Sequence, residues 1–294
     1  MTDDDWLARR FEAHRAHLRS VAYRMLGSLT EADDAVQESW LRLSRTDTSD
    51  VANLGGWLTT VVSRVCLDML RSRTSRREEP LDEHLPDPII EPDTDADPER
   101  HALLADSVGI ALLVVLETLN PAERLAFVLH DMFGVPFEEI APIIDRTPAS
   151  ARQLASRARR RVRGTTTAPE PDRARQRAVV DAYFAAASSG DFEALVAVLD
   201  PDVVLRADMG GRTLATIHGA ANVANNALMF RRAGDGQFTI RRVLVNGSVG
   251  MVSMRNGELR SVVGCTVVGD KIAQLDILSD VDRLRNLDLG ALDA

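Results

Sequence analysis

Cysteine is scarce in this sequence, and long apolar stretches are missing from it. The two cysteines, Cys66 and Cys265, lie about two hundred residues apart in apolar surroundings. This favours buried free thiols over a disulfide framework or a clustered metal site. No stretch approaches the roughly 18 apolar residues of a membrane span, and the acidic N-terminal segment has no apolar signal core. We therefore expect a soluble, cytoplasmic protein without a metal ion or cofactor.

Lysine is nearly missing as well, because Lys271 is the one lysine among 35 basic residues. Acidic residues are in excess, and the formal net charge of -9 argues against a protein whose whole surface binds nucleic acid. The distribution of charge along the chain matters more than its sum. With 294 residues, 45% of them apolar, the chain is long enough for two or three domains.

The N-terminal part has the apolar spacing of amphipathic helices. Apolar residues recur every three or four positions from Phe11 to Leu43, which predicts two helices separated by residues 27–30. Thr30, with Asp33 three residues later, resembles a helix N-cap. A third helix with a basic end is predicted from Trp57 to Arg71.

An acidic, proline-rich segment follows. Residues 78–99 contain ten acidic residues, five prolines and neither lysine nor arginine. Such a segment cannot bury enough apolar surface to fold alone, so we expect an extended linker over residues 78–100.

A helix-turn-helix is predicted beyond this linker. Helices are expected at 103–119, 121–132, 136–144 and 148–163, with Asn120 and Thr147 as caps before prolines. The last two form the helix-turn-helix, and residues 145–163 hold seven arginines against one acid. The side chains placed to reach base edges are Arg152, Gln153, Ser156 and Arg157. Arg159 and Arg160, with Arg161 and Arg163, are expected to contact phosphates.

The remainder of the chain predicts an α+β domain. After a second linker at 165–172, two helices are expected at 174–188 and 192–199. Strand patterns bounded by turns then follow at 203–206, 238–245, 249–254, 261–268 and 272–278. Helices followed by strands favour an antiparallel sheet with helices on one side.

The N-terminal helices resemble region two of extracytoplasmic-function RNA polymerase sigma factors. The resemblance lies in residues 32–43 (ADDAVQESWLRL), 57–64 (WLTTVVSR) and 67–71 (LDMLR). It implies that promoter DNA and core polymerase are the partners. The residues implied to dock on the beta-prime clamp are Asp33, Asp34, Gln37 and Glu38. The loop of residues 46–56, with Asp50 and Asn53, is implied to read a flipped base of the minus-ten element.

The resemblance extends to sigma factors that carry a C-terminal SnoaL-like domain of the NTF2-like fold. It rests on the proline motif 85–88 (LPDP), the glycine-rich turn 208–212 (DMGGR) and residues 279–284 (SDVDRL). It implies that this domain regulates the sigma regions, with a small molecule or a protein left open as its ligand. The implied regulatory contacts are Leu85, Pro86, Pro88, Asp208, Gly210 and Gly211.

The sequence thus predicts a multidomain chain of two all-α sigma domains and an α+β SnoaL-like cone. The expected divisions are 6–77 (region two), 78–100 (linker), 101–164 (a four-helix region four), 165–172 (linker) and 173–290 (SnoaL-like domain). The predicted function is a non-catalytic sigma factor. Two alternatives are a helix-turn-helix regulator without the sigma role, and a SnoaL-like enzyme using Asp208, His218 or Asp276 as a base.

Overall fold

The structure, a computed structural model, describes residues 3–46, 51, 53–75, 84–94, 108–165, 172–211, 214–233 and 238–287. The chain divides into two compact units. The first unit comprises residues 1–80 and 113–165, and the second comprises residues 81–112 and 166–294. The linker that was expected to join two sigma domains therefore clusters with the C-terminal domain.

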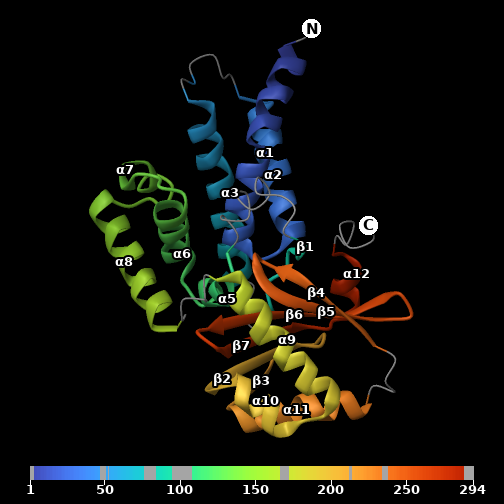
Figure 1. The fold of residues 1–294 in the computed structure, drawn as a ribbon. Helices are drawn as coiled ribbons and strands as arrows, with labels where there is room; N and C mark the ends of the chain where they lie inside the picture. Colours follow the sequence, from blue (N-terminus) through green and yellow to red (C-terminus); the bar gives the residue numbers. More distant parts are fainter. Residues whose placement is uncertain are drawn as a thin grey trace. The chain divides into compact units, whose positions relative to one another are not determined.

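The first unit is helical (Figure 1). Its described elements are α1 (Asp3–Leu26), α2 (Leu29–Leu43), α3 (Leu54–Ser75), α6 (Pro121–Phe127), the π-helix η1 (Val128–Met132), α7 (Phe137–Ile140) and α8 (Pro148–Thr165). Helix α5 (Ile110–Glu117) runs from the second unit into the first. Phe11 and Leu58 are fully buried between α1, α2 and α3, and the ring of Phe11 packs 5.2 Å from that of Trp40.

The helix ends correct the sequence prediction in two places. Ser28, not Thr30, caps α2, because its side chain accepts the amide of Glu31, which completes a capping-box pattern two residues earlier. The helix predicted over 136–144 is α-helical only to Ile140, and Asp145 turns the chain with a positive φ of 54°. The predicted caps Asn120 and Thr147 are confirmed, since they accept the amides of Ala122 and Ser150.

Buried arginines join the two halves of the first unit. Arg124 on α6 is 3% exposed and donates from Nε to the carbonyl of Arg24 on α1 at 3.3 Å. Burial lowers the pKa of Arg124 to about 10. The guanidinium of Arg24 lies 4.8 Å from the ring centroid of Phe133, and the ring of His17 meets that ring edge-on.

The second unit is built on a seven-stranded sheet with strand order β1-β4-β5-β6-β7-β2-β3. The strands are β1 (Ile90–Pro92), β2 (Leu199–Asp208), β3 (Ala215–His218), β4 (Thr239–Val245), β5 (Ser248–Arg255), β6 (Glu258–Val268) and β7 (Lys271–Leu278). All neighbouring pairs are antiparallel except β2 and β7. The helices are α9 (Arg173–Ser189), α10 (Phe192–Val198), α11 (Ala220–Ala233) and α12 (Val281–Arg285).

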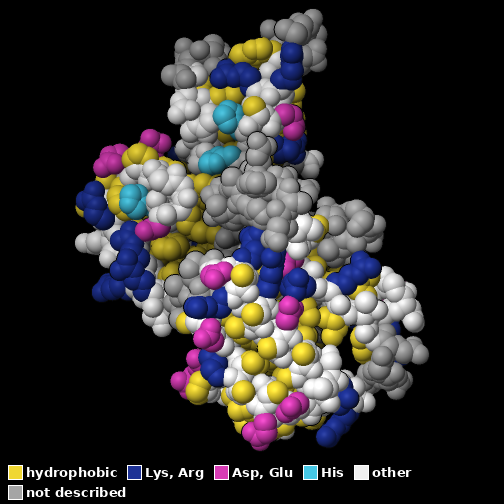
Figure 2. Space-filling model, viewed as in Figure 1, with side chains coloured by type: hydrophobic (Ala, Val, Ile, Leu, Met, Phe, Trp, Pro, Cys, Tyr) yellow, Lys and Arg dark blue, Asp and Glu magenta, His cyan; other side chains and the backbone are white. Residues whose placement is uncertain are grey.

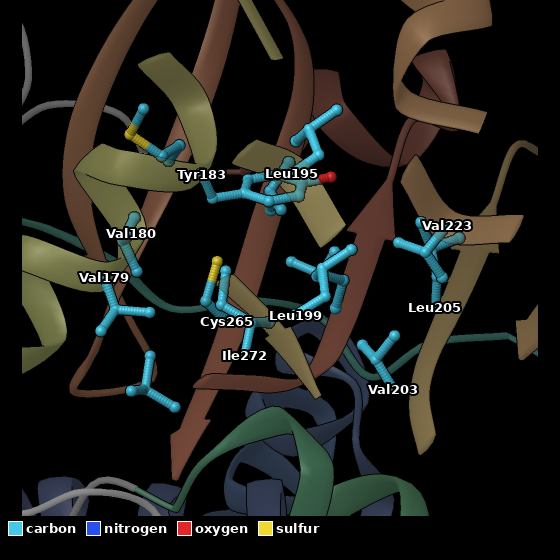
Figure 3. Close-up of a cluster of buried hydrophobic side chains, with 14 of the residues drawn as sticks. Val179, Val180, Tyr183, Leu195, Leu199, Val203, Leu205, Val223, Cys265 and Ile272 are labelled. Atoms are coloured by element: carbon cyan, nitrogen blue, oxygen red, sulfur yellow. The ribbon is translucent and has the colours of Figure 1, made fainter. Parts of the chain in front are cut away.

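One face of this sheet packs against α9, α10 and α11. Figure 3 shows the apolar core between them, to which Val180 and Tyr183 contribute from α9, Leu195 from α10 and Val223 from α11. Leu205, Cys265 and Leu275 are register neighbours on β2, β6 and β7 and lie in the same core. Because side chains alternate along a strand, those of Arg206 and Asp276, the next residues on β2 and β7, point to the opposite face.

Four elements of this unit were not predicted: β1, β3, α11 and α12. Residues 78–100 were expected to form an extended linker, and in the described residues 84–94 this segment is not a free tether. Residues 90–92 are the edge strand β1, which pairs with β4. Residues 78–83 and 95–100 lie outside the described residues.

Candidate DNA-binding helix and linker clamp

Helix α8 buries one face and exposes its arginines. Ala151, Ala155, Ala158 and Val162 recur at helical spacing and are buried in the first unit. The opposite side carries the basic residues, which Figure 2 shows as dark-blue side chains over α8. Of the predicted DNA contacts, Arg152, Gln153, Ser156, Arg157 and Arg160 are exposed and Arg159 is half-buried. The predicted surface is therefore one continuous helix face.

Two of these arginines are already paired with acids of the same unit. Arg157 donates from Nε to Glu123 on α6 at 2.7 Å, and Arg159 pairs with Asp131 on η1 at 2.7 Å. The guanidinium of Arg152 lies 5.3 Å from the ring centroid of Phe137. Sequence reasoning did not identify Glu123 or Asp131, because each lies about thirty residues from its partner.

The predicted polymerase-docking residues lie on the outer side of α2. Asp33, Asp34 and Gln37 are exposed, and Glu38 is half-buried. Asp33 forms an ion pair with Arg19 on α1 at 2.7 Å, and Glu38 pairs with Arg42 at 2.9 Å. Exposed ion pairs of this kind contribute little to stability, so Asp33 and Glu38 can give up these arginines for other cationic partners at little cost.

Of the two residues predicted to read the minus-ten element, the structure describes Asn53. Asp50 lies outside the described residues. Asn53 is exposed, and its side-chain oxygen accepts the amide of Gly56 at 3.0 Å, so it caps the start of α3. This cap fixes the orientation of the Asn53 carboxamide.

Three of the six predicted regulatory residues, Leu85, Asp208 and Gly210, meet in the second unit. Asp208, whose side chain is 3% exposed, accepts the amide of Leu85 at 3.0 Å and the guanidinium of Arg283 at 2.6 Å. Its other oxygen accepts the amide of Gly210 at 3.2 Å. Leu85, Pro86 and Pro88 are buried, whereas Gly210 and Gly211 are exposed. Both glycines have positive φ values, 78° and 130°, which only glycine adopts without strain.

Arg283 on α12 closes this arrangement. Besides Asp208, it donates to the carbonyl of Leu85 at 2.6 Å and pairs with the carboxylate of Asp87. We refer to Leu85, Asp87, Asp208, Gly210 and Arg283 as the linker clamp. Arg283 belongs to the motif 279–284, and it contacts residues of the other two motifs, 85–88 and 208–212.

The candidate acid-base residues do not form one site. Asp208 belongs to the linker clamp, and His218 is exposed at the end of β3. Asp276 accepts hydrogen bonds from Arg206 at 2.7 Å and from Gln274 at 2.6 Å on the sheet face opposite α9, α10 and α11. Burial raises the pKa of Asp276 despite the attraction of Arg206.

Both cysteines are free and buried, as predicted. Cys66 lies in the first unit and Cys265 in the second. Burial raises the pKa of each thiol to about 12.

Neither thiol is therefore expected to react in the native chain. At pH 8 a thiol with a pKa of about 12 is almost entirely protonated, and the thiolate is the reactive form. Iodoacetamide followed by mass spectrometry should label both cysteines at least about a hundredfold faster in urea, where the pKa returns to roughly 8.5. Comparable rates with and without urea would contradict the burial of the thiols.

Three family descriptions match the chain. Sigma-70 region 2 matches residues 10–76, sigma-70 region 4 matches residues 110–162, and a SnoaL-like domain matches residues 180–273. These matches define the class, an RNA polymerase sigma factor with a SnoaL-like domain. No helix in the described part of the chain is long and apolar enough to span a membrane.

The curated relatives narrow the class to one family. The chain is 42% identical to ECF RNA polymerase sigma factor SigJ of Mycobacterium tuberculosis over 82% of this chain and 78% of SigJ. It is 35% identical to the probable ECF sigma factor SigI of the same organism over 97% and 98% of the two chains. The crystal structure of M. tuberculosis SigJ superposes with a TM-score of 0.75 at 33% identity, covering 96% and 99% of the chains. The chain belongs to the extracytoplasmic-function sigma factors.

The predicted family, fold class and sigma function are thereby confirmed. A sigma factor acts with core RNA polymerase on promoter DNA. The alternative of a helix-turn-helix regulator without the sigma role leaves the match to sigma-70 region 2 unexplained.

Proposed function

We propose that this sigma factor reads the minus-thirty-five element with α8, docks on the beta-prime clamp of core polymerase with α2, and is restrained by its own SnoaL-like domain. The linker clamp carries the last part of the proposal, because Arg283 binds two linker residues, Leu85 and Asp87, at the same time as Asp208. The segment between the two sigma regions is thus bound to the C-terminal domain.

For promoter reading, the support is the exposed face of α8. Gln153, Ser156 and Arg160 are exposed there, at spacings that place them together. Gln153 has the geometry to contact a base edge, whereas Arg160 is placed to meet phosphate. Arg157 and Arg159 join them by exchanging their acidic partners Glu123 and Asp131 for DNA, since both ion pairs are partly exposed. Arg157 then contacts a base edge and Arg159 a phosphate.

For core binding, the support is the exposed acidic side of α2. Asp34 is exposed and lies beside Asp33, whose ion-pair partner Arg19 is itself 45% exposed at its side chain. For the minus-ten element we propose Asp50 and Asn53, which precede α3.

The experiment that tests this proposal separates docking from promoter reading. Asp34→Arg should abolish co-elution with core polymerase, because it reverses a charge on the docking face. Gln153→Ala should leave co-elution unchanged and weaken holoenzyme binding to the cognate promoter by about 1–3 kcal/mol, the usual value of one base-edge contact. Co-elution is followed by gel filtration, and promoter binding by fluorescence anisotropy.

Arg232→Ala on α11 is the matched control, since Arg232 is exposed in the second unit, and it should change neither readout. Equal loss of cognate and mismatched minus-thirty-five DNA with Gln153→Ala would assign this residue to phosphate contact. If the Asp34→Arg variant still co-eluted with core polymerase, α2 would not be part of the docking surface.

We further propose that the SnoaL-like domain is not catalytic and that the chain acts in the cytoplasm, where polymerase and promoters are. In favour of the first point, the described core between the helices and the sheet is apolar. Asp208 is bound in the linker clamp, Asp276 is bound by Arg206 and Gln274, and His218 is exposed at the end of β3. A fold of this type does not specify an activity. A small molecule or a protein remains open as its ligand.

A further inference from the structure

The linker is held in a second place, independent of the linker clamp. Strand β1 pairs with the edge of β4 over three residues, with Ile90 opposite Val245, Glu91 opposite Leu244 and Pro92 opposite Val243. Without β1, β4 would be an edge strand with unpaired amides and carbonyls, which is a template for another extended chain.

Asn246 reads the backbone where this strand begins. Its side-chain oxygen accepts the backbone amide of Ile89 at 3.0 Å, and the backbone amide of Asn246 donates to the carbonyl of Ile89 at 2.8 Å. Asn246 has a φ of 50° and lies in the turn between β4 and β5. These bonds require only an extended backbone, so they fit any peptide that enters in the same register.

Asp93 is the specific anchor where the strand ends. Its carboxylate, 2% exposed, accepts three hydrogen bonds from Arg177 at 2.7, 2.9 and 3.2 Å and one from Arg242 at 2.7 Å. Burial alone would raise the pKa of Asp93, but these bonds outweigh it and hold the pKa below its usual value. Arg242 is itself oriented by Asp181 at 2.7 Å.

We propose that the β4 edge, with Asn246, Arg177 and Arg242, is a binding site for an extended segment of a partner protein that carries an apolar residue and, three residues later, an aspartate. The chain's own linker occupies the site in cis through Ile90, 8% exposed, and Asp93. This is addition of a strand to a sheet edge, in which main-chain bonds supply affinity and side-chain anchors supply selectivity. The cis pairing is only three residues long, and Pro92 donates no amide, so it is replaceable.

The inference rests on the proposed function for its consequence, because a partner that displaces β1 acts on the linker that the clamp restrains. Binding at the edge is nevertheless measurable without polymerase. The probe is a labelled peptide of residues 88–94, which excludes Leu85 and Asp87 and so leaves the linker clamp untouched.

The acceptor for the test is the full chain with Ile90→Asp and Asp93→Ala, which empties the edge in cis. Fluorescence anisotropy should show that this variant binds the peptide at least about tenfold more tightly than the unmodified chain, where the tethered linker competes at high effective concentration. The same peptide with Asp93→Asn should bind about tenfold more weakly, as should the unmodified peptide on the acceptor with Arg242→Ala.

Failure of the peptide to bind the acceptor, while Cys265 stays protected from iodoacetamide, would overturn the proposal. The milder variant Asp93→Ala alone replaces the acceptor if the double substitution exposes Cys265. Tighter capture of a second full chain than of the peptide would also overturn it, in favour of strand exchange between copies. Transcription with clamp variants tests the proposed function separately, so the two ideas fail by different measurements.

Discussion

Asp208→Ala is expected to destabilise the second unit by about 3 kcal/mol and to release the linker to proteolysis. The carboxylate is 3% exposed and is the shared acceptor of the Leu85 amide and the Arg283 guanidinium. Removing one partner of a buried pair costs about 3–5 kcal/mol, because the remaining charge and donors stay buried without an acceptor. Arg283 is 22% exposed and keeps Asp87, so the lower end applies.

The two buried cysteines report on the two units separately. Since 1.4 kcal/mol corresponds to a factor of ten, Asp208→Ala should raise the labelling rate of Cys265 on the order of a hundredfold and leave that of Cys66 unchanged. Thermolysin should cut near Leu85, which is buried in the unmodified chain. Asp202→Ala, at an exposed position of the same strand, is the matched control.

The clamp also predicts a coupling between residues. Asp208→Ala and Arg283→Ala should be strongly non-additive, because each removes the same ion pair. Additive effects of the two substitutions on the free energy of unfolding would mean that Arg283 acts through the carbonyl of Leu85 rather than through Asp208.

In transcription with core polymerase, Arg283→Ala should raise promoter-dependent RNA at least about threefold if the clamp restrains the linker. Unchanged output, with the linker shown to be released, would refute the regulatory proposal.

The helices of the first unit could be predicted from the sequence because helix caps and apolar spacing are local features. Asn120 and Thr147 cap helices next to prolines, and the apolar spacing of α1 to α3 matches their buried faces. The ion pairs that orient α8 were not readable, since Glu123 and Arg157 are 34 residues apart and only the packing of α6 on α8 brings them together.

The second unit was predicted less completely for physical reasons. Strand β3 has only four residues, and α11 contains Asn222, Asn225 and Asn226, which have low helix propensity. Neither β3 nor α11 has a strong periodic pattern of apolar residues, so the conformation of both depends on tertiary packing.

The linker shows the same limit of local reasoning. Its composition indicated a segment that cannot fold alone, but composition does not reveal partners that are far away in the sequence: Asp93 and Arg242 are separated by 149 residues. From the sequence, the carboxylate of Asp93 in a proline-rich segment is expected to be solvated. Only the folded sheet brings Arg242 within hydrogen-bond distance of it.

Gly250→Ala is expected to destabilise the second unit by about 3 kcal/mol or more, against the usual preference for alanine. In a strand interior, alanine is favoured over glycine by roughly 0.5–1 kcal/mol. Gly250 on β5 pairs with Gly264 on β6, and an added Cβ would lie 2.5 Å from the carbonyl oxygen of Val263 and 2.7 Å from Cγ2 of Val245. The first of these atoms is backbone, so relief requires β5 and β6 to separate, and overpacking of this kind outweighs the local preference.

The measurement again compares the two thiols. Gly250→Ala should accelerate labelling of Cys265 at least about a hundredfold at pH 8, while Cys66 and the fluorescence of the tryptophans, which all lie in the first unit, stay unchanged. Gly109→Ala is the matched control, because it belongs to the second unit and an added Cβ meets nothing within 4 Å. It should change the free energy of unfolding by no more than about 0.5 kcal/mol. An effect of Gly250→Ala no larger than that of Gly109→Ala would show that the close approach of β5 and β6 does not set the requirement for glycine at position 250.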